Sequence, residues 1–190
     1  MIQDLTAPKW QRSQTGGRCR IADILAKRSV ADYKMRYHDI TKDDMKNGDG
    51  LRAVLWVSGC EHACPGCQNP VTWDPEDGLL FDEKAREELF EILGRDYISG
   101  LTLSGGDPLY PGNREDILSL LKEVKEAFPD KTVWCYTGYL YDEVKNLPHM
   151  EYIDVLVDGK YVEALADKQY KWAGSTNQKV YDLHSKTVII

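Results

Sequence analysis

From residue 51 onward, short apolar runs alternate with amphipathic stretches, and this alternation limits the folds open to the chain. Runs rich in branched and aromatic residues are typical of buried strands, and longer stretches with apolar residues at helical spacing are typical of helices. The strands are predicted within 51–58, 100–108, 131–139 and 151–161, and the helices within 81–95, 113–128 and 141–146. Alternating units of this kind predict an α/β fold with a parallel sheet and right-handed crossovers. Because a full barrel of eight units needs about 250 residues, we expect a partial, open (β/α) TIM-like barrel from a chain of 190 residues.

The two longer helices carry their own signals. Asp82 is a suitable N-cap for the first helix, and Gly94 stands near its end. The apolar residues fall on one face of each helix: Leu89, Ile92 and Leu93 in the first, and Ile117, Leu120, Leu121 and Val124 in the second. These stripes predict that each helix packs one face against the sheet.

The predicted strands end in unusual polar or glycine-rich turns. The first ends in SGCEHACPGC, the second in SGGDP and the fourth in VDGK, while the third ends in the milder YTGY. Parallel α/β folds place their ligand sites at the carboxyl ends of the strands. We therefore expect the four turns to line one cleft.

Charge divides the chain into two parts. Residues 1–34 carry an excess of Lys and Arg, whereas the rest is strongly acidic and brings the formal net charge to −7. We interpret 1–34 as a basic, mobile extension, or as residues upstream of a natural start at Met35, and 35–190 as one domain. A nucleic-acid-binding or targeting arm is the alternative for 1–34, which contains no organised motif. Cys19 lies in this part and is assigned no function.

Composition also bears on partners and location. The acidic balance argues against a nucleic-acid or anionic-membrane surface, because both depend on clustered Lys and Arg. The sequence has no apolar run long enough to span a bilayer and no signal-peptide pattern at its start. We expect a cytoplasmic protein whose partners are small molecules or proteins, with no nucleic acid and no membrane among them.

Three cysteines stand close together in the turn after the first predicted strand: Cys60, Cys64 and Cys67. Thiolates at this spacing are typical of zinc or iron-sulfur sites. A structural zinc site normally has four protein ligands, but no second cysteine pair exists, and Cys135 stands alone in an apolar run. A cube of four irons held by three cysteines leaves one iron open to a substrate or cofactor. The placement favours iron-sulfur chemistry over an incomplete zinc site or a chance cluster.

The motifs together resemble a known family. A C-x-x-x-C-x-x-C loop after one strand and a G-G-D-P loop after the next are similar to the radical S-adenosylmethionine superfamily. The segments GDGLRAVLWVSGCEHACPGCQNPVTW, LTLSGGDPLYPGN, WCYTGY, LVDGKY and WAGSTNQ resemble one branch, the anaerobic ribonucleoside-triphosphate reductase-activating proteins. The resemblance covers 35–184, and five motifs in order make it specific.

The resemblance implies a role for each matching residue. The metal ligands of a [4Fe-4S] cluster would be Cys60, Cys64 and Cys67, and the open iron would bind S-adenosylmethionine. The residues in contact with S-adenosylmethionine would be Ser104, Gly105, Gly106 and Asp107 at its methionine part, Gly66, Cys67 and Gln68 along its adenine, and Asp158 and Lys160 at a strand end. Exposed carbonyls and Asp107 would accept hydrogen bonds from its ammonium group. No catalytic residue beyond the cluster ligands is implied.

Some residues depart from the superfamily pattern or have ordinary alternatives. Gly66 stands where many members have an aromatic residue, Gln68 where we expect an aromatic residue, and Asp107 where Glu is commoner. We expect His62 to be a solvent-facing loop histidine and Cys135 to be a buried small hydrophobe. The amides of Asn177 and Gln178 suit binding of a ligand or a partner backbone.

The resemblance also implies a protein substrate. A member of this branch removes a hydrogen atom from a glycine of the large subunit of anaerobic ribonucleoside-triphosphate reductase, and leaves a glycyl radical there. Flavodoxin or ferredoxin would supply the electron. Two alternatives remain: an activase of another glycyl-radical enzyme of the formate-lyase type, and a zinc-binding module without enzymatic activity.

Overall fold

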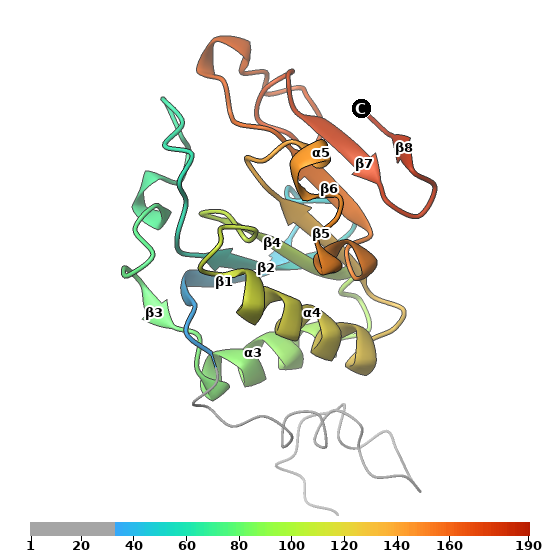
Figure 1. Cartoon of the computed structure of the whole chain (residues 1–190). Helices are drawn as coiled ribbons and strands as arrows, with labels where there is room; N and C mark the ends of the chain where they lie inside the picture. The colour runs from blue at the N-terminus through green and yellow to red at the C-terminus, as the bar shows by residue number, and fades with distance from the viewer. Residues whose placement is uncertain (1–32) are drawn as a thin grey trace, which may run out of the picture.

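The computed structural model describes residues 33–190, and its centre is one mixed eight-stranded sheet (Figure 1). The strands lie in the order β3-β1-β2-β4-β5-β6-β7-β8. Their bounds are β1 Arg36–Asp44, β2 Arg52–Val57, β3 Leu79–Leu80, β4 Gly100–Gly105, β5 Thr132–Tyr136, β6 Val155–Asp158, β7 Lys179–Asp182 and β8 Thr187–Val188. The predicted extension 1–34 and Cys19 lie outside the described residues, except that Tyr33 is buried and the Lys34 amide donates to Asp116.

The four predicted strands form the parallel centre of the sheet, so this part of the prediction is confirmed. β2, β4, β5 and β6 pair in chain order, each parallel to the next. One row across them consists of Leu55, Leu103, Cys135 and Leu156, all with no exposed surface. Strands buried on both faces read as continuous apolar runs, which is why the sequence reveals them. Cys135 is the buried small residue that was expected, and its burial raises the pKa of its thiol.

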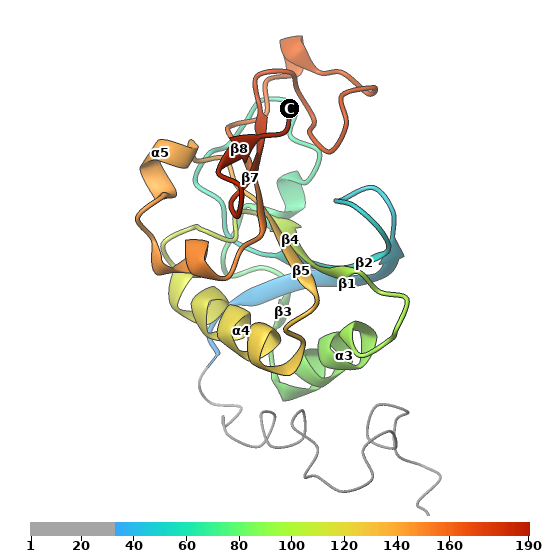
Figure 2. The same cartoon turned by 90° about the vertical axis from the view of Figure 1, so that its right-hand side faces the viewer.

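Two helices cover one face of this sheet. α3 (Glu83–Leu93) and α4 (Arg114–Ala127) lie side by side beneath the strands in both views (Figures 1 and 2). The Asp82 side chain accepts a hydrogen bond of 3.0 Å from the Ala85 amide, as predicted for an N-cap, and Gly94 is the C-cap. The expected apolar stripes of both helices are buried, and Arg86 Nε on α3 pairs with Glu123 Oε2 on α4 at 3.0 Å.

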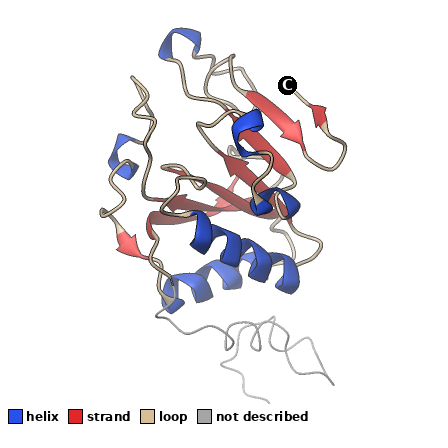
Figure 3. Ribbon diagram, in the orientation of Figure 1, coloured by secondary structure: helices blue, strands red, loops and turns tan. Residues whose placement is uncertain are grey.

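The shorter helical elements lie around the loops (Figure 3). They are η2 Pro70–Thr72, α5 Tyr141–Val144, η3 Pro148–Glu151 and η4 Glu163–Leu165. α5 stops two residues before the predicted end at 146, and Lys145 is its C-cap. Among residues 33–190, no helix has the length and apolar character needed to cross a membrane.

The other face of the sheet carries a smaller apolar cluster. Trp134 points to this face because it alternates with Cys135 along β5. Its ring packs on Trp172 at 4.9 Å between centroids, and the guanidinium of Arg52 lies 5.5 Å from its centre. Arg52 is fully buried, and burial lowers its pKa to about 10. The segment that follows β6 is thereby held over the face that α3 and α4 leave uncovered.

The sheet departs from the predicted barrel in its margins. It is mixed and does not close: within the described residues, its edges are β3 and β8, and β1 and β7 pair antiparallel to their neighbours. The sequence analysis predicted neither β1 nor β7. β1 is polar and only partly buried, so it lacks the apolar run that marks the central strands. The α/β class and the open form are confirmed, whereas a TIM-like barrel is not.

Candidate functional site

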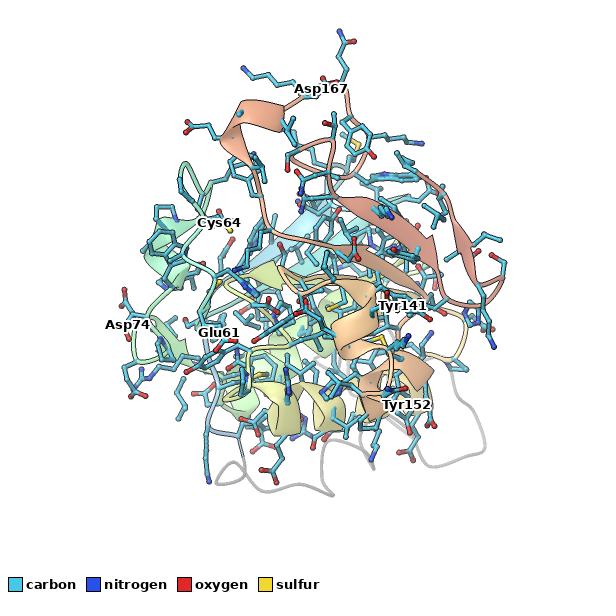
Figure 4. The ribbon with its side chains drawn as sticks, turned by 45° about the horizontal axis from the view of Figure 1, so that its top comes forward. Glu61, Cys64, Asp74, Tyr141, Tyr152 and Asp167 are labelled. Atoms are coloured by element: carbon cyan, nitrogen blue, oxygen red, sulfur yellow. The ribbon has the colours of Figure 1, made fainter. Side chains whose placement is uncertain are left out.

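A pocket of about 1070 Å³ opens where the loops after the parallel strands meet. Pockets that hold small molecules commonly have about 300–1,000 Å³, so this one is roomy. In Figure 4, Cys64 on the cysteine loop and Asp167 on the segment after β6 mark two residues that line it. The predicted site residues on its wall are Cys60, Cys64, Cys67, Gln68, Ser104, Gly105 and Gly106. The expected convergence of loops from separate strands is therefore found.

The cysteine loop, 58–69, leaves β2 and is anchored at its base. The Gly59 and Cys60 amides donate to the carbonyls of Thr72 and Trp73 at 2.8 and 3.0 Å. A tight turn follows, in which the Cys67 amide donates to the Cys64 carbonyl at 3.1 Å. Gly66 in this turn has φ +72°, a left-handed conformation that glycine adopts without strain. The loop thus curls its three thiols toward one space.

The three thiols are free and half-buried. Burial raises the pKa of Cys60, while backbone hydrogen bonds from the next residues act to lower it. Three thiols on one pocket wall suit a four-iron cluster, in which each thiolate binds a different iron. Within residues 33–190, no three Cys, His, Asp or Glu side chains are arranged to hold a single metal ion. The donor set fits a [4Fe-4S] cluster with one iron open to the pocket.

The glycine loop after β4 docks directly on the base of the cysteine loop. The Gly106 amide donates to the Val57 carbonyl at 2.7 Å, and the Asp107 amide donates to the Gly59 carbonyl at 2.8 Å. A Cβ at Gly106 would lie 2.5 Å from the Gly59 carbonyl oxygen. Glycine is therefore needed here for contact between the two loops, in addition to any contact with a ligand.

The carboxylate of Asp107 faces the protein and does not line the pocket. Its side chain is 1% exposed. The oxygens accept hydrogen bonds from the Leu109 amide (2.8 Å), the Thr137 hydroxyl (2.9 and 3.0 Å), the Gly138 amide (2.9 Å) and His62 Nε2 (2.7 Å). Two oxygens offer about four acceptor sites. The chain's own donors fill them, so the expected bond to an ammonium group has no free acceptor on this side chain.

The prediction for His62 is wrong. Its side chain is only 4% exposed, because the ring is enclosed between Asp107 and the turn after β5. The ring packs edge-on against Tyr139 at 4.5 Å between centroids, and the Tyr139 hydroxyl bonds to Glu61. The position of His62 in a polar loop suggested that its ring faces solvent. The acceptor that holds the ring is Asp107, which lies 45 residues further along the chain.

The turn after β6 contains the remaining predicted residues. Asp158 is 3% exposed, and its oxygens accept from the Tyr141 and Lys179 amides at 2.7 and 3.2 Å. Lys160 is exposed, and of the residues 158–160 only Gly159 lines the pocket. The Asn177 amide donates to the Lys160 carbonyl at 2.9 Å, and the Gln178 amide donates to Gly159 at 2.9 Å. These amides bind the chain's own backbone.

Sequence reasoning missed the far wall of the pocket. It is formed by 166–174 and 44–47, with Trp56 and Tyr136 between them. Only 172–174 belong to a segment quoted for the family resemblance, WAGSTNQ, in which the expected binding residues were Asn177 and Gln178. The stretches 166–171 and 44–47 carry no motif that marks them as part of a site. Trp172 is the anchor of the first segment, since its ring packs on Trp134.

Comparison with known proteins agrees with this geometry. The family described as "4Fe-4S single cluster domain" matches residues 46–181. Proteins named anaerobic ribonucleoside-triphosphate reductase-activating protein from Enterobacteria phage T4, Haemophilus influenzae and Escherichia coli K12 are 47%, 43% and 43% identical to the chain. The alignments cover 77%, 77% and 78% of this chain and 94%, 97% and 99% of the relatives. The chain therefore belongs to the family of anaerobic ribonucleoside-triphosphate reductase-activating proteins.

Proposed function

We propose that this chain is a radical S-adenosylmethionine enzyme that activates an anaerobic ribonucleoside-triphosphate reductase by forming a glycyl radical on its large subunit. The observation that carries the proposal is the shared pocket: three free thiols and the glycine loop after β4 line one space. The names of relatives with 43–47% identity supply the reductase as the target.

Each wall of the pocket has its own part in the proposal. Cys60, Cys64 and Cys67 hold the cluster, and S-adenosylmethionine occupies the adjoining space. When bound, the cluster supplies the electron that splits S-adenosylmethionine into methionine and a 5'-deoxyadenosyl radical. The main chain of 104–107 offers carbonyls to the methionine ammonium group, and the main chain of 66–68 lies along the adenine.

The turn after β6 closes the pocket on the side of Asp158 and Lys160. The buried Asp158 carboxylate caps the start of α5 and so fixes the turn. Gly159 reaches the pocket through its main chain, and Lys160, the next residue, is exposed. In this proposal, the four parallel strands correspond to the partial TIM-like barrel of the superfamily.

The open pocket suits a protein substrate. Its volume of about 1070 Å³ exceeds the range of about 300–1,000 Å³ common for small-molecule pockets, and in this proposal the additional space admits an extended segment of a partner. The large subunit of the reductase would supply that segment, and flavodoxin or ferredoxin would supply the electron. We place the protein in the cytoplasm, with no nucleic acid or membrane among its partners, in keeping with a net charge of −7.

The test is to mix the iron-reconstituted protein with the reductase large subunit, S-adenosylmethionine and a reductant under anaerobic conditions. We expect the paramagnetic resonance doublet of a glycyl radical on the large subunit. Cys67→Ala should give none, because it removes a cluster ligand. Cys135→Ala is the matched control, since it removes a buried thiol outside the pocket and should leave the signal in place.

The same assay separates the alternatives. A radical on a formate-lyase type enzyme, and none on the reductase, would reassign the partner. Protein that binds zinc and no iron, and forms no radical with either partner, would overturn the proposal.

A further inference from the structure

We propose that His62 and Asp107 are positioning residues: with Thr137 and Gly138 they form a clasp that holds the middle of the cysteine loop against the loops after β4 and β5. The functional consequence rests on the proposed cluster site. The clasp itself rests only on contacts within residues 33–190.

The middle of the cysteine loop, 61–66, is attached to the rest of the described residues by side chains, not by backbone hydrogen bonds. In the part of the chain that the structure describes, no backbone hydrogen bond joins 61–66 to another element; the carbonyl of Cys64 is used within the loop, by the amide of Cys67. The base is held through Gly59 and Cys60, which lie before this stretch. Side chains must therefore position it, and His62 is the one that is buried.

Asp107 is built to receive His62. The His62 ring donates to the Asp107 carboxylate in the tautomer that carries its proton on Nε2. The distance is 2.7 Å, and the two side chains are 4% and 1% exposed. The Thr137 hydroxyl and the Gly138 amide donate to the same Asp107 oxygen, Oδ2, that His62 contacts. One carboxylate thus joins the loops that follow β2, β4 and β5.

The turn after β5 is shaped around the imidazole. A Cβ at Gly138 would lie 2.2 Å from His62 Cδ2, so any larger residue would displace the ring. Tyr139 closes over the ring edge at 4.5 Å, and its hydroxyl bonds to Glu61, the residue before His62. A solvent-exposed loop histidine would need neither this space nor this cover.

The clasp has a consequence for the thiols. His62 lies between Cys60 and Cys64, so fixing its ring fixes how the loop leaves Cys60 and where Cys64 lies. Asp107 directly follows Gly105 and Gly106 on the opposite pocket wall. The clasp therefore sets the distance between the cluster ligands and the glycine loop that is proposed to hold the methionine end of S-adenosylmethionine.

The first test uses the full chain without its cluster and measures amide hydrogen exchange by mass spectrometry. In His62→Ala we expect the peptide that spans 60–68 to exchange about tenfold faster at its hydrogen-bonded amides, those of Cys60 and Cys67, as expected for the loss of a buried hydrogen bond. Strand β4 should keep its protection. His62→Gln should restore most of the protection in 60–68, because its amide has a similar reach to Nε2.

His149→Ala is the matched control. His149 is also buried, its Nε2 bonds to the Arg114 carbonyl at 2.7 Å, and within residues 33–190 no hydrogen bond joins it to 60–68. It should leave exchange in 60–68 unchanged. If His62→Ala does not fold, His62→Asn replaces it, since its shorter amide cannot reach Asp107. Unchanged exchange in 60–68 of a folded His62 variant would overturn the clasp.

The second test uses the iron-loaded protein and follows the paramagnetic resonance spectrum of the reduced cluster as S-adenosylmethionine is added. His62→Ala should need about tenfold more S-adenosylmethionine for the half-maximal spectral change, and His149→Ala should titrate like the wild type. A lower melting temperature with an unchanged titration would reduce His62 to a structural residue and overturn its positioning role. Wild-type protein that binds no iron would refute the proposed function instead, and the exchange result would still decide the clasp.

Discussion

The helix-covered face of the sheet and the carboxyl ends of its strands are stabilised in different ways. Under α3 and α4, fully buried residues such as Leu55, Leu103 and Leu156 pack in rows, and apolar contact is non-directional. At the strand ends, the buried carboxylates of Asp107 and Asp158 hold loops by hydrogen bonds from amides of other segments. Apolar packing fixes the sheet, and directed polar bonds fix the site.

This contrast predicts different sensitivities. A core built on apolar area tolerates a change of shape better than a loss of volume. A loop held by one carboxylate tolerates neither a loss of charge nor a change of reach, because buried donors are then left without an acceptor. The following substitutions separate the two regions by comparing unfolding free energy with iron binding.

Leu103→Ala should have the largest effect on stability. The residue has no exposed surface and lies in the middle of the parallel sheet, so the loss should be about 2–5 kcal/mol in urea unfolding. Iron content per folded molecule should stay at the wild-type level, because the loops at the strand ends are held by hydrogen bonds to buried carboxylates. A folded variant that has lost its iron would show that the two regions are not separate.

Asp107→Asn should lower the unfolding free energy less than Leu103→Ala does, and should lower S-adenosylmethionine cleavage more. The amide has the same shape, but its nitrogen cannot accept from the donors that face the carboxylate, and the expected loss is about 1–3 kcal/mol. We expect S-adenosylmethionine cleavage to fall more than iron content does. Measuring both on one preparation checks this, and wild-type cleavage at reduced stability would contradict it.

Low pH should lower the stability of the helix-covered face of the sheet through His149. Burial lowers the pKa of this side chain below its ordinary 6.5, although its bond to the Arg114 carbonyl acts to raise it. The unfolded chain therefore binds the proton more readily, and stability contributed by neutral His149 is lost as the pH falls from about 6.5 through the lower folded pKa. His149→Gln should reduce this pH dependence in urea unfolding. An identical pH profile would rule out His149 as its source.

Lys42→Ala should have the smallest effect. Lys42 Nζ pairs with Glu88 Oε1 at 2.8 Å, but both side chains are nearly half exposed. Exposed pairs contribute about 0–1 kcal/mol, so thermal unfolding and iron binding should both stay close to wild type. A loss as large as that of Leu103→Ala would mean that β1 depends on this pair.

The sequence predicts the regions that apolar pattern controls. The strands β2, β4, β5 and β6 and the N-cap Asp82 follow from local residues alone. β1 escapes prediction because its polar residues, 36–44, become a strand only by pairing with the free edge of β2. Pairing of this kind depends on distant residues, which periodicity does not reveal.

The sequence predicts which loops share the pocket, but not the direction in which several of their side chains point. The thiols and the glycine loop share a pocket, as the order of strands and turns indicates. The inward turn of Asp107, the burial of His62 and the self-binding of Gln178 depend on which donors the fold brings near each side chain. Residue type alone does not distinguish a carboxylate that faces a ligand from one that faces the protein.

The most direct test of the central claim is formation of 5'-deoxyadenosine by the reduced, iron-reconstituted protein given S-adenosylmethionine. The account predicts cleavage by the wild type and by Cys135→Ala, and none by Cys60→Ala, Cys64→Ala or Cys67→Ala. Cleavage that persists in the three loop variants, or iron-loaded wild-type protein that forms no 5'-deoxyadenosine, would contradict the claim that these thiols hold the cluster that cleaves the cofactor.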